Sequence, residues 1–124
     1  YLAPAKAASL PPALLITGTK DKTDPPGAWD DFAVTTTSNQ TDRYFYESAS
    51  ATIRAWSTAS GCRVGAVAAP VDAPAPFDCR AYCPGERQNV RALDCRLEMG
   101  HEYREADAWP LTLDFFLSRH RQQG

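Results

Sequence analysis

An aspartate and a histidine in this chain each follow a short apolar run that ends in glycine. The run 14–18 leads to Asp21, and the run 97–100 leads directly to His101. In open α/β sheets, functional side chains lie just beyond the carboxyl ends of the strands. A carboxylate beside a histidine fixes the imidazole tautomer and stabilises its charged form, as hydrolysis by a serine nucleophile requires. Asp21 and His101 are therefore the candidate acid and base of a hydrolytic triad.

Other interpretations of these residues stay open at this point. A turn aspartate such as Asp21 commonly caps nearby backbone N–H groups. Asp24 is the second candidate acid, and it can equally cap the turn before Pro25. The other histidine, His120, falls on an expected helix, where a packed or solvated side chain is the usual case.

A nucleophile is the component that these residues lack. No G-x-S-x-G elbow occurs in the sequence. Ser57, Ser60 and Ser118 fall on expected helices, outside the strand-to-helix turn that exposes a nucleophile, so none of them is nominated.

The two glycine-terminated runs are expected to lie in strands. Residues 13–19 are expected to form the first strand, because a short apolar run that begins at Leu14 and ends at Gly18 is typical of a strand buried on both faces, as in parallel sheets. Residues 90–99 partly alternate between apolar and polar, and a shorter strand at 79–83 precedes them across a turn at 84–89. Residues 63–78 contain prolines without periodicity and are expected to form a surface excursion.

The first expected helix runs from about residue 41 to residue 60. Thr41 or Asp42 can cap its first turn, and Gly61 supplies the left-handed residue at its end. One face carries residues at helical spacing: Phe45, Ala49, Thr52, Ile53 and Trp56.

The second expected helix spans about 108–121, with Asp107 as its cap and Pro110 in its first turn. Its shared face consists of Trp109, Leu113, Phe116, Leu117 and His120. The aromatic residues of both helices are expected in the core: Phe45, Trp56, Trp109 and Phe116. Together the elements predict an α/β fold in which helices cover a sheet.

Four cysteines between residues 62 and 95 indicate disulfides and an oxidising compartment. If the turn between the two later strands is centred near Arg87, Cys79 lies opposite Cys95. Cross-strand cysteines reach disulfide geometry when nearly opposed, which favours Cys79–Cys95 and leaves Cys62 to pair with Cys83. Four cysteines allow three pairings, so the other two stay open.

No metal or cofactor is expected. The cysteines lack the paired C-x-x-C units of a zinc ribbon. Four acidic residues are interpreted as solvated carboxylates: Asp30, Asp31, Glu102 and Glu105.

Composition limits the class of protein further. The 124 residues carry a formal charge of -2 and are 44% apolar, which suits one globular domain and gives no reason to expect nucleic acid. No apolar run is long enough to span a bilayer. The chain starts without an initiator methionine or a signal-peptide pattern, so we expect a processed, excised or incomplete polypeptide.

Four segments occur in an order that is typical of one enzyme family. Residues 14–25 form an apolar strand, a G-x-x-D, a loop and a proline. W-S-T-A-S-G-C at 56–62 is a helix end followed by G-C, C-R-A-Y-C at 79–83 is a C-x-x-x-C, and V-R-A-L-D-C-R-L-E-M-G-H at 90–101 is a strand ending in G-H. The chain from Pro12 to Arg121 thereby resembles secreted α/β-hydrolase esterases of the polyhydroxybutyrate depolymerase and feruloyl esterase-like group.

The resemblance implies the C-terminal part of an α/β-hydrolase sheet, with covering helices and a disulfide-stapled hairpin, as a single partial domain over 1–124. It implies Asp21 as triad acid and His101 as triad base, acting on an ester. The serine and the oxyanion-hole donors would lie in an N-terminal half of the same hydrolase, the implied partner of this chain. It also implies a secreted or periplasmic protein.

One departure from the family concerns the substrate. Glu102-Tyr103-Arg104 follows the histidine, where depolymerase-like members usually carry a tryptophan-proline segment. A polyester substrate is therefore not implied. The alternative to an enzyme is a non-catalytic, disulfide-stabilised binding or structural module, and a serine-bearing partner would discriminate between the two.

Overall fold

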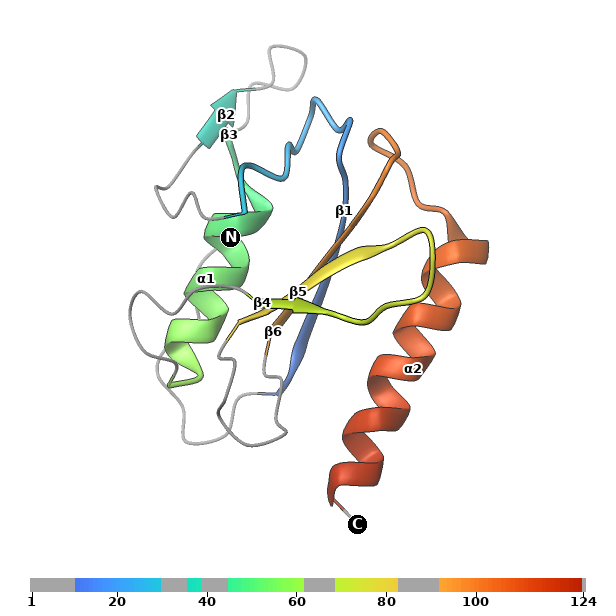
Figure 1. The fold of residues 1–124 in the computed structure, drawn as a ribbon. Coiled ribbons are helices and arrows are strands. Elements are labelled where there is room, and N and C mark those ends of the chain that lie inside the picture. The colour runs from blue at the N-terminus through green and yellow to red at the C-terminus, as the bar shows by residue number, and fades with distance from the viewer. Residues whose placement is uncertain (1–10, 30–35, 39–44, 62–68, 83–91, 124) are drawn as a thin grey trace.

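The computed structural model contains one mixed four-stranded sheet with a helix on either side (Figure 1). It describes residues 11–29, 36–38, 45–61, 69–82 and 92–123. The sheet has the order β1–β6–β5–β4, with β1 at Ala13–Gly18, β4 at Ala69–Val71, β5 at Asp78–Tyr82 and β6 at Ala92–Leu97. The helices are α1, Ala49–Ala59, and α2, Glu105–Gln123, and a separate pair consists of β2, Thr36–Ser38, and β3, Phe45–Glu47. The α/β fold expected from the sequence is confirmed at this level.

The strands β1 and β6 form the parallel pair on which the fold depends. They run in register from Ala13 opposite Ala92 to Gly18 opposite Leu97. Both strands therefore end at the same edge of the sheet. β5 pairs with the other side of β6 and is antiparallel to it.

Helices cover both faces of β1, which explains the consecutive apolar residues 13–16 at its start. Leu14 and Ile16 pack against the cluster that includes Leu111 of α2. Leu15 packs on the opposite face, in the cluster that includes Ile53 of α1. Successive strand residues point to opposite faces, so a strand between two helices favours apolar side chains at consecutive positions.

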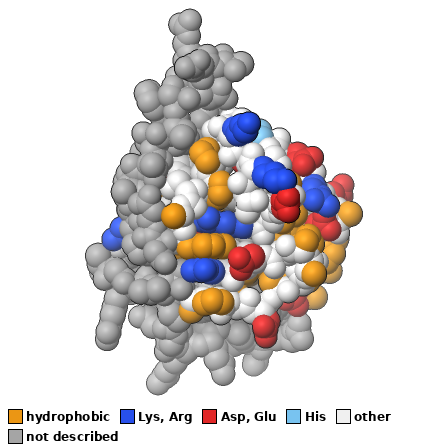
Figure 2. Space-filling view, turned by 45° about the horizontal axis from the view of Figure 1, so that its top comes forward, with side chains coloured by type: hydrophobic (Ala, Val, Ile, Leu, Met, Phe, Trp, Pro, Cys, Tyr) orange, Lys and Arg blue, Asp and Glu red, His pale blue; other side chains and the backbone are white. Residues whose placement is uncertain are grey.

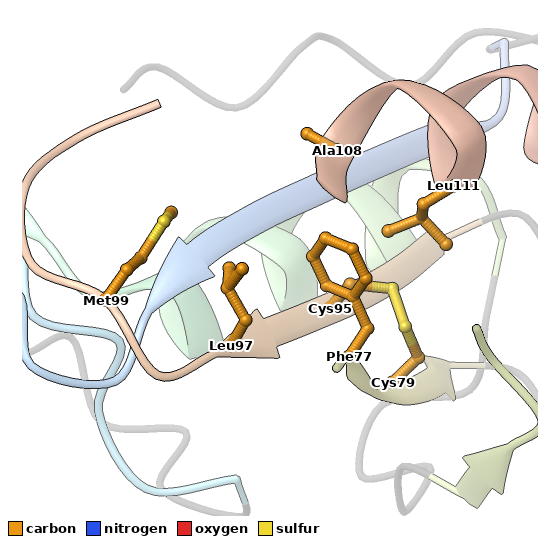
Figure 3. Close-up of a cluster of buried hydrophobic side chains, with 7 residues drawn as sticks. All are labelled: Phe77, Cys79, Cys95, Leu97, Met99, Ala108 and Leu111. Carbon is orange, nitrogen blue, oxygen red and sulfur yellow. A yellow bond between two sulfur atoms is a disulfide. The ribbon is translucent and has the colours of Figure 1, made fainter. Parts of the chain in front are cut away.

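A disulfide joins β5 to β6 inside the α2-side core. Cys79 and Cys95 are direct partners in the ladder, both are at most 1% exposed, and they form the predicted disulfide. Figure 3 shows the bridge beside Phe77 and close to Leu111 of α2. Cys62 and Cys83 lie outside the described residues, so their predicted pairing is not described.

The first helix starts later than the sequence indicated. It begins at Ala49, and Ser48 caps it, because the Ser48 hydroxyl accepts a hydrogen bond from the Ala51 amide at 3.1 Å. Phe45 belongs to β3 and not to the helix, while Thr41 and Asp42 lie outside the described residues. The helix end was predicted correctly, since Gly61 has a φ of 94°.

A short strand occupies part of the expected surface excursion. Residues 69–71 form β4 and pair with β5, with Pro70 opposite Arg80. The expectation that residues 63–78 form a surface excursion is therefore wrong for residues 69–71. Proline lacks the N–H that a central strand needs but is tolerated in an edge strand, and β4 is at the edge of the sheet.

The prediction for the last helix is wrong in its start and in its buried face. The helix begins at Glu105, so Asp107 lies in its first turn, where it forms an ion pair with Arg104, and Pro110 lies inside the helix. The face toward the sheet carries the buried residues Ala108, Leu111 and Phe115. The two aromatic residues of this helix that were expected in the core are exposed, Trp109 at 57% and Phe116 at 62%. Leu113 and Leu117, on the same expected face, are 43% and 48% exposed. None of the helices in the described part of the chain is long and apolar enough to cross a bilayer.

Candidate active site

The backbones of β1 and β6 stay paired beyond the ends of the two strands. The Thr19 amide donates to the Leu97 carbonyl at 2.9 Å, and the Lys20 amide donates to the Met99 carbonyl at 3.0 Å. This continued pairing guides Asp21 and His101 to the same place, although they are far apart in the sequence. The expectation that both residues follow neighbouring strand ends agrees with this arrangement.

Asp21 sits in a tight turn that uses one of its carboxylate oxygens. Its Oδ1 accepts hydrogen bonds from the amides of Thr23 at 2.8 Å and Asp24 at 2.9 Å. The Asp21 amide donates to the Gly18 carbonyl at 3.2 Å. Asp21 therefore caps its own turn, and its second oxygen is left to face outward from that turn.

That second oxygen contacts His101. The Nδ1 atom of His101 lies 2.8 Å from Oδ2 of Asp21. The Asp21 side chain is 7% exposed, whereas the His101 ring is 62% exposed. An ionised carboxylate can only accept hydrogen bonds, so the proton of a neutral His101 is on Nδ1. The other ring nitrogen, Nε2, is then a proton acceptor on an exposed ring.

The electrostatics favour a charged pair. Burial raises the pKa of Asp21, but hydrogen bonds from the Asp24 amide, from His101 and from the Thr23 amide outweigh burial and hold that pKa below its ordinary value. The hydrogen bond to Asp21 and its negative charge raise the pKa of His101 above 6.5. Asp21 therefore stabilises an imidazolium at His101, which is what a general base needs after it takes a proton.

Asp24, the second candidate acid, does not form the hydrogen bond to His101. Its amide supports Asp21, and the His101 ring is paired with Asp21. Burial and the neighbouring charge of Asp21 raise the pKa of Asp24. A carboxyl with a raised pKa is a poorer partner for an imidazolium, so Asp21 is the stronger candidate acid.

Two serines that the sequence placed on the first helix, Ser57 in α1 and Ser60 at its C-cap, hydrogen-bond to backbone carbonyls of α1. The Ser57 hydroxyl donates to the Ile53 carbonyl at 2.7 Å, and the Ser60 hydroxyl donates to the Trp56 carbonyl at 2.9 Å. Neither is in the position of a nucleophile. Across the described residues, no group of three or more His, Cys, Asp or Glu side chains could hold a metal ion.

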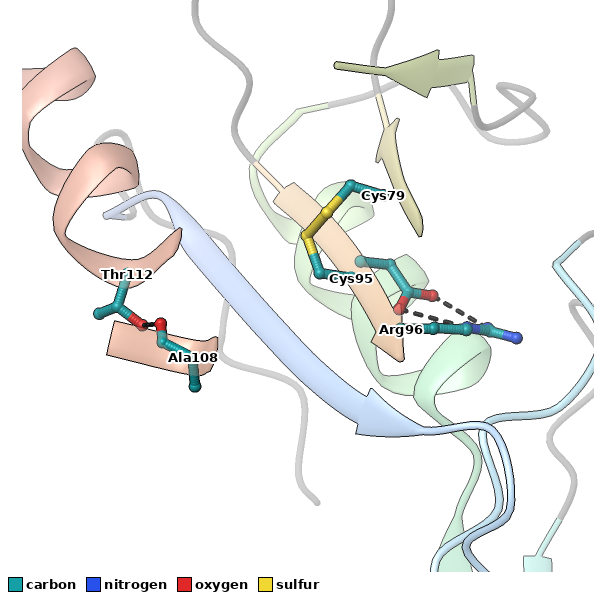
Figure 4. The surroundings of a disulfide bond; sticks show 6 residues. Cys79, Cys95, Arg96, Ala108 and Thr112 are labelled. Carbon is teal, nitrogen blue, oxygen red and sulfur yellow. Dashed lines mark hydrogen bonds and ion pairs between the residues drawn. A yellow bond between two sulfur atoms is a disulfide. The ribbon is translucent and has the colours of Figure 1, made fainter. Parts of the chain in front are cut away.

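A buried charged pair near the site was missed by the sequence analysis. Asp94 is fully buried and Arg96 is 5% exposed, and Arg96 Nη2 lies 3.0 Å from Asp94 Oδ2. Figure 4 shows Arg96 and the Cys79–Cys95 bridge extending from β6 to different sides of the strand. Two charged residues two positions apart in an otherwise apolar strand were the available signal.

Charges of both signs are mixed on the surface. On the face seen in Figure 2, the described basic and acidic side chains are interspersed with apolar ones. The described part of that face therefore offers no broad patch of one charge to a polyanionic partner.

Comparison of this chain with protein-family models, with curated proteins and with solved structures found no match. The case for a function therefore depends on the residues and their geometry.

Proposed function

We propose that this chain supplies the acid and the base of a secreted serine carboxylesterase of the α/β-hydrolase type. The observation that carries the proposal is the contact of 2.8 Å between Asp21 and His101 beyond the ends of two parallel strands. In α/β-hydrolases the acid precedes the histidine in the chain, as it does here.

In the proposed mechanism, Asp21 keeps the proton of His101 on Nδ1, so that Nε2 can take the proton of a serine hydroxyl. The serine oxygen attacks the ester carbonyl, and His101 then passes its proton to the leaving alcohol. Water, deprotonated by His101, releases the acid from the acyl-enzyme. Asp21 orients His101 and stabilises the imidazolium at each of these steps.

The serine would be provided by a segment outside these 124 residues, because no nucleophile elbow occurs within them. Two features of the described part support such a partner. β1 packs apolar residues on both faces, yet it is an edge strand of the described sheet, and no described strand pairs with its outer side. The exposed apolar residues of α2 provide further surface for it to bury.

The second candidate function is a binding module without catalysis. The exposed stripe of Trp109, Leu113, Phe116 and Leu117 favours it, because apolar side chains at this spacing on a helix are typical of a docking face. In that case His101 and Asp21 form a structural pair. Substitution of His101 would then leave the module's partner binding unchanged.

Ester hydrolysis by the full-length gene product tests the proposal. We expect His101→Ala to reduce kcat on the order of 10⁶-fold, and Asp21→Asn to reduce it about 10⁴-fold. His120→Ala is the matched control, since His120 is the only other histidine in the chain. Turnover that persists in His101→Ala, with thermal unfolding near wild type, would remove His101 from the mechanism.

A further inference from the structure

The loop that follows Asp21 is held through its backbone carbonyls by buried side chains. Four consecutive carbonyls, from Pro26 to Trp29, accept hydrogen bonds from three different elements. Arg96 of β6 donates to Gly27 at 2.5 Å and to Pro26 at 3.3 Å. Ser50 of α1 donates from its hydroxyl to Ala28 at 2.6 Å, and Tyr82 of β5 donates to Trp29 at 3.2 Å. Side chains thus replace the hydrogen bonds that a strand or helix would provide.

Arg96 is itself fixed in place on every side. Asp94 accepts from Arg96 Nη2 at 3.0 Å and from Nε at 3.4 Å, and Ser50 accepts from Nη2 at 2.9 Å. The guanidinium also lies 3.8 Å from the centre of the Trp29 ring. A planar group with several donors held at one angle is a rigid support for two carbonyls, which a lysine could not reproduce.

The loop also fits closely onto the start of α1. Gly27 has a φ of 75°, and a Cβ on it would lie 3.0 Å from Cβ of Ser48. The Ser50 amide, which has no partner within the first turn of a helix, donates to the Pro26 carbonyl at 3.1 Å. The loop therefore has one position relative to α1 and β6.

We propose that Arg96 and Ser50 are positioning residues for the candidate acid: by holding residues 26–29 they fix the turn that presents Asp21 to His101. Residues 22–25 connect Asp21 to the held residues 26–29, and the prolines at 25 and 26 restrict the backbone at this junction. β6 thus provides both the residue that holds the loop of Asp21 and the strand that leads to His101. The catalytic consequence rests on the proposed function, whereas the effect on the Asp21–His101 contact does not.

The titration of His101 by NMR, in the 124-residue chain, measures this effect. The chain has two histidines, so His120 gives an internal control in the same spectra. We expect Arg96→Lys to move the pKa of His101 most of the way toward its value in Asp21→Asn. Ser50→Ala should move this pKa in the same direction by a smaller amount, and the titration of His120 should be unchanged in both variants. Arg80→Lys is the matched control: Arg80 lies 4.6 Å from the Trp29 ring centre, and its Nε has no hydrogen-bond partner among the described residues.

The outcomes separate positioning from general stabilisation. If Arg96→Lys lowers the unfolding temperature while the pKa of His101 stays as in the wild type, Arg96 is only structural and the proposal is overturned. If Arg96→Lys does not fold, the same comparison is made in Ser50→Ala: a lower unfolding temperature with an unchanged pKa of His101 overturns the proposal. If Asp21→Asn itself leaves the pKa of His101 unchanged, the contact is absent and the proposed function loses its basis, which is a different failure.

Discussion

Gly18 and Met99 lie so close together that a Cβ built on Gly18 would fall 2.3 Å from the Met99 carbonyl oxygen. The Gly100 carbonyl oxygen would be 2.6 Å away. Both neighbours are backbone atoms, so the strand ends can approach only if residue 18 has no side chain. This approach allows the pairing beyond β1 and β6 and thereby brings Asp21 to His101.

We predict that Gly18→Ala separates the strand ends. The added methyl group cannot be accommodated without a backbone shift, so the free energy of unfolding should fall by about 1–3 kcal/mol. The raised pKa of His101 should also be lost. Gly100→Ala is the matched control, because a Cβ there meets nothing within 4 Å. Denaturant unfolding and NMR titration check both effects, and equal behaviour of the two variants would contradict this explanation.

The Asp21–His101 pair should give stability a defined pH dependence. The lowered pKa of Asp21 means that its contribution is lost as pH falls through the folded value. The raised pKa of His101 means that its contribution is complete below 6.5 and is lost as pH rises through the folded value. Both stabilising contributions are present at pH values between the ordinary pKa values of the two groups, 3.8 for Asp21 and 6.5 for His101.

Asp21→Asn should therefore destabilise the chain most within that pH window. The difference from the wild type should shrink as pH rises through the raised pKa of His101, above which His101 is neutral in both. Asp24→Asn is the comparison variant, since His101 is paired with Asp21 and not with Asp24. Urea unfolding at several pH values measures the difference. A loss of stability that does not vary with pH would show that Asp21 acts only as a turn cap.

The Cys79–Cys95 disulfide should stabilise the fold substantially. The cysteines are 16 residues apart, and closing a loop of that size in the unfolded chain contributes about 3 kcal/mol. We expect the double variant Cys79→Ala, Cys95→Ala to lose at least this amount, because both sulfurs are also buried in the α2-side core. Chemical denaturation provides the measurement. A loss below about 1 kcal/mol would mean that neither loop closure nor core packing operates as described.

The ion pair between Asp94 and Arg96 should also be costly to break. Asp94→Ala leaves the buried guanidinium of Arg96 without its carboxylate, at a cost of about 3–5 kcal/mol. Asp78→Ala on β5 removes an exposed carboxylate and should change stability by about 0.5 kcal/mol or less. Equal losses in the two variants, measured by denaturant unfolding, would argue against a buried pair.

The local pattern of the sequence was sufficient to predict the strands that carry the site. Residues 13–16 are consecutively apolar because helices cover both faces of β1, and this pattern is visible without a structure. The glycine before each functional segment and the opposed cysteines also depend on local rules. Asp21 was expected to act either as a turn cap or as a partner of His101, and in the structure its two oxygens do both.

The features that were missed depend on tertiary contacts. α2 has apolar side chains on two faces, and only packing against the sheet selects Leu111 and Phe115 over Trp109 and Phe116. Asp94 and Arg96 alternate with apolar residues, a pattern that normally indicates a solvent-exposed face. Here that face is covered by α1 and the loop at 26–29, which no local pattern indicates.

Labelling of the full-length gene product with a serine-directed fluorophosphonate, followed by mass analysis under denaturing conditions, tests the central claim most directly. We predict one labelled serine outside these 124 residues in the wild type and in His120→Ala, and no labelling in His101→Ala, because the serine needs His101 as its base. A serine that is labelled equally in His101→Ala, or no labelled serine in any variant, would contradict the assignment of Asp21 and His101 to an esterase.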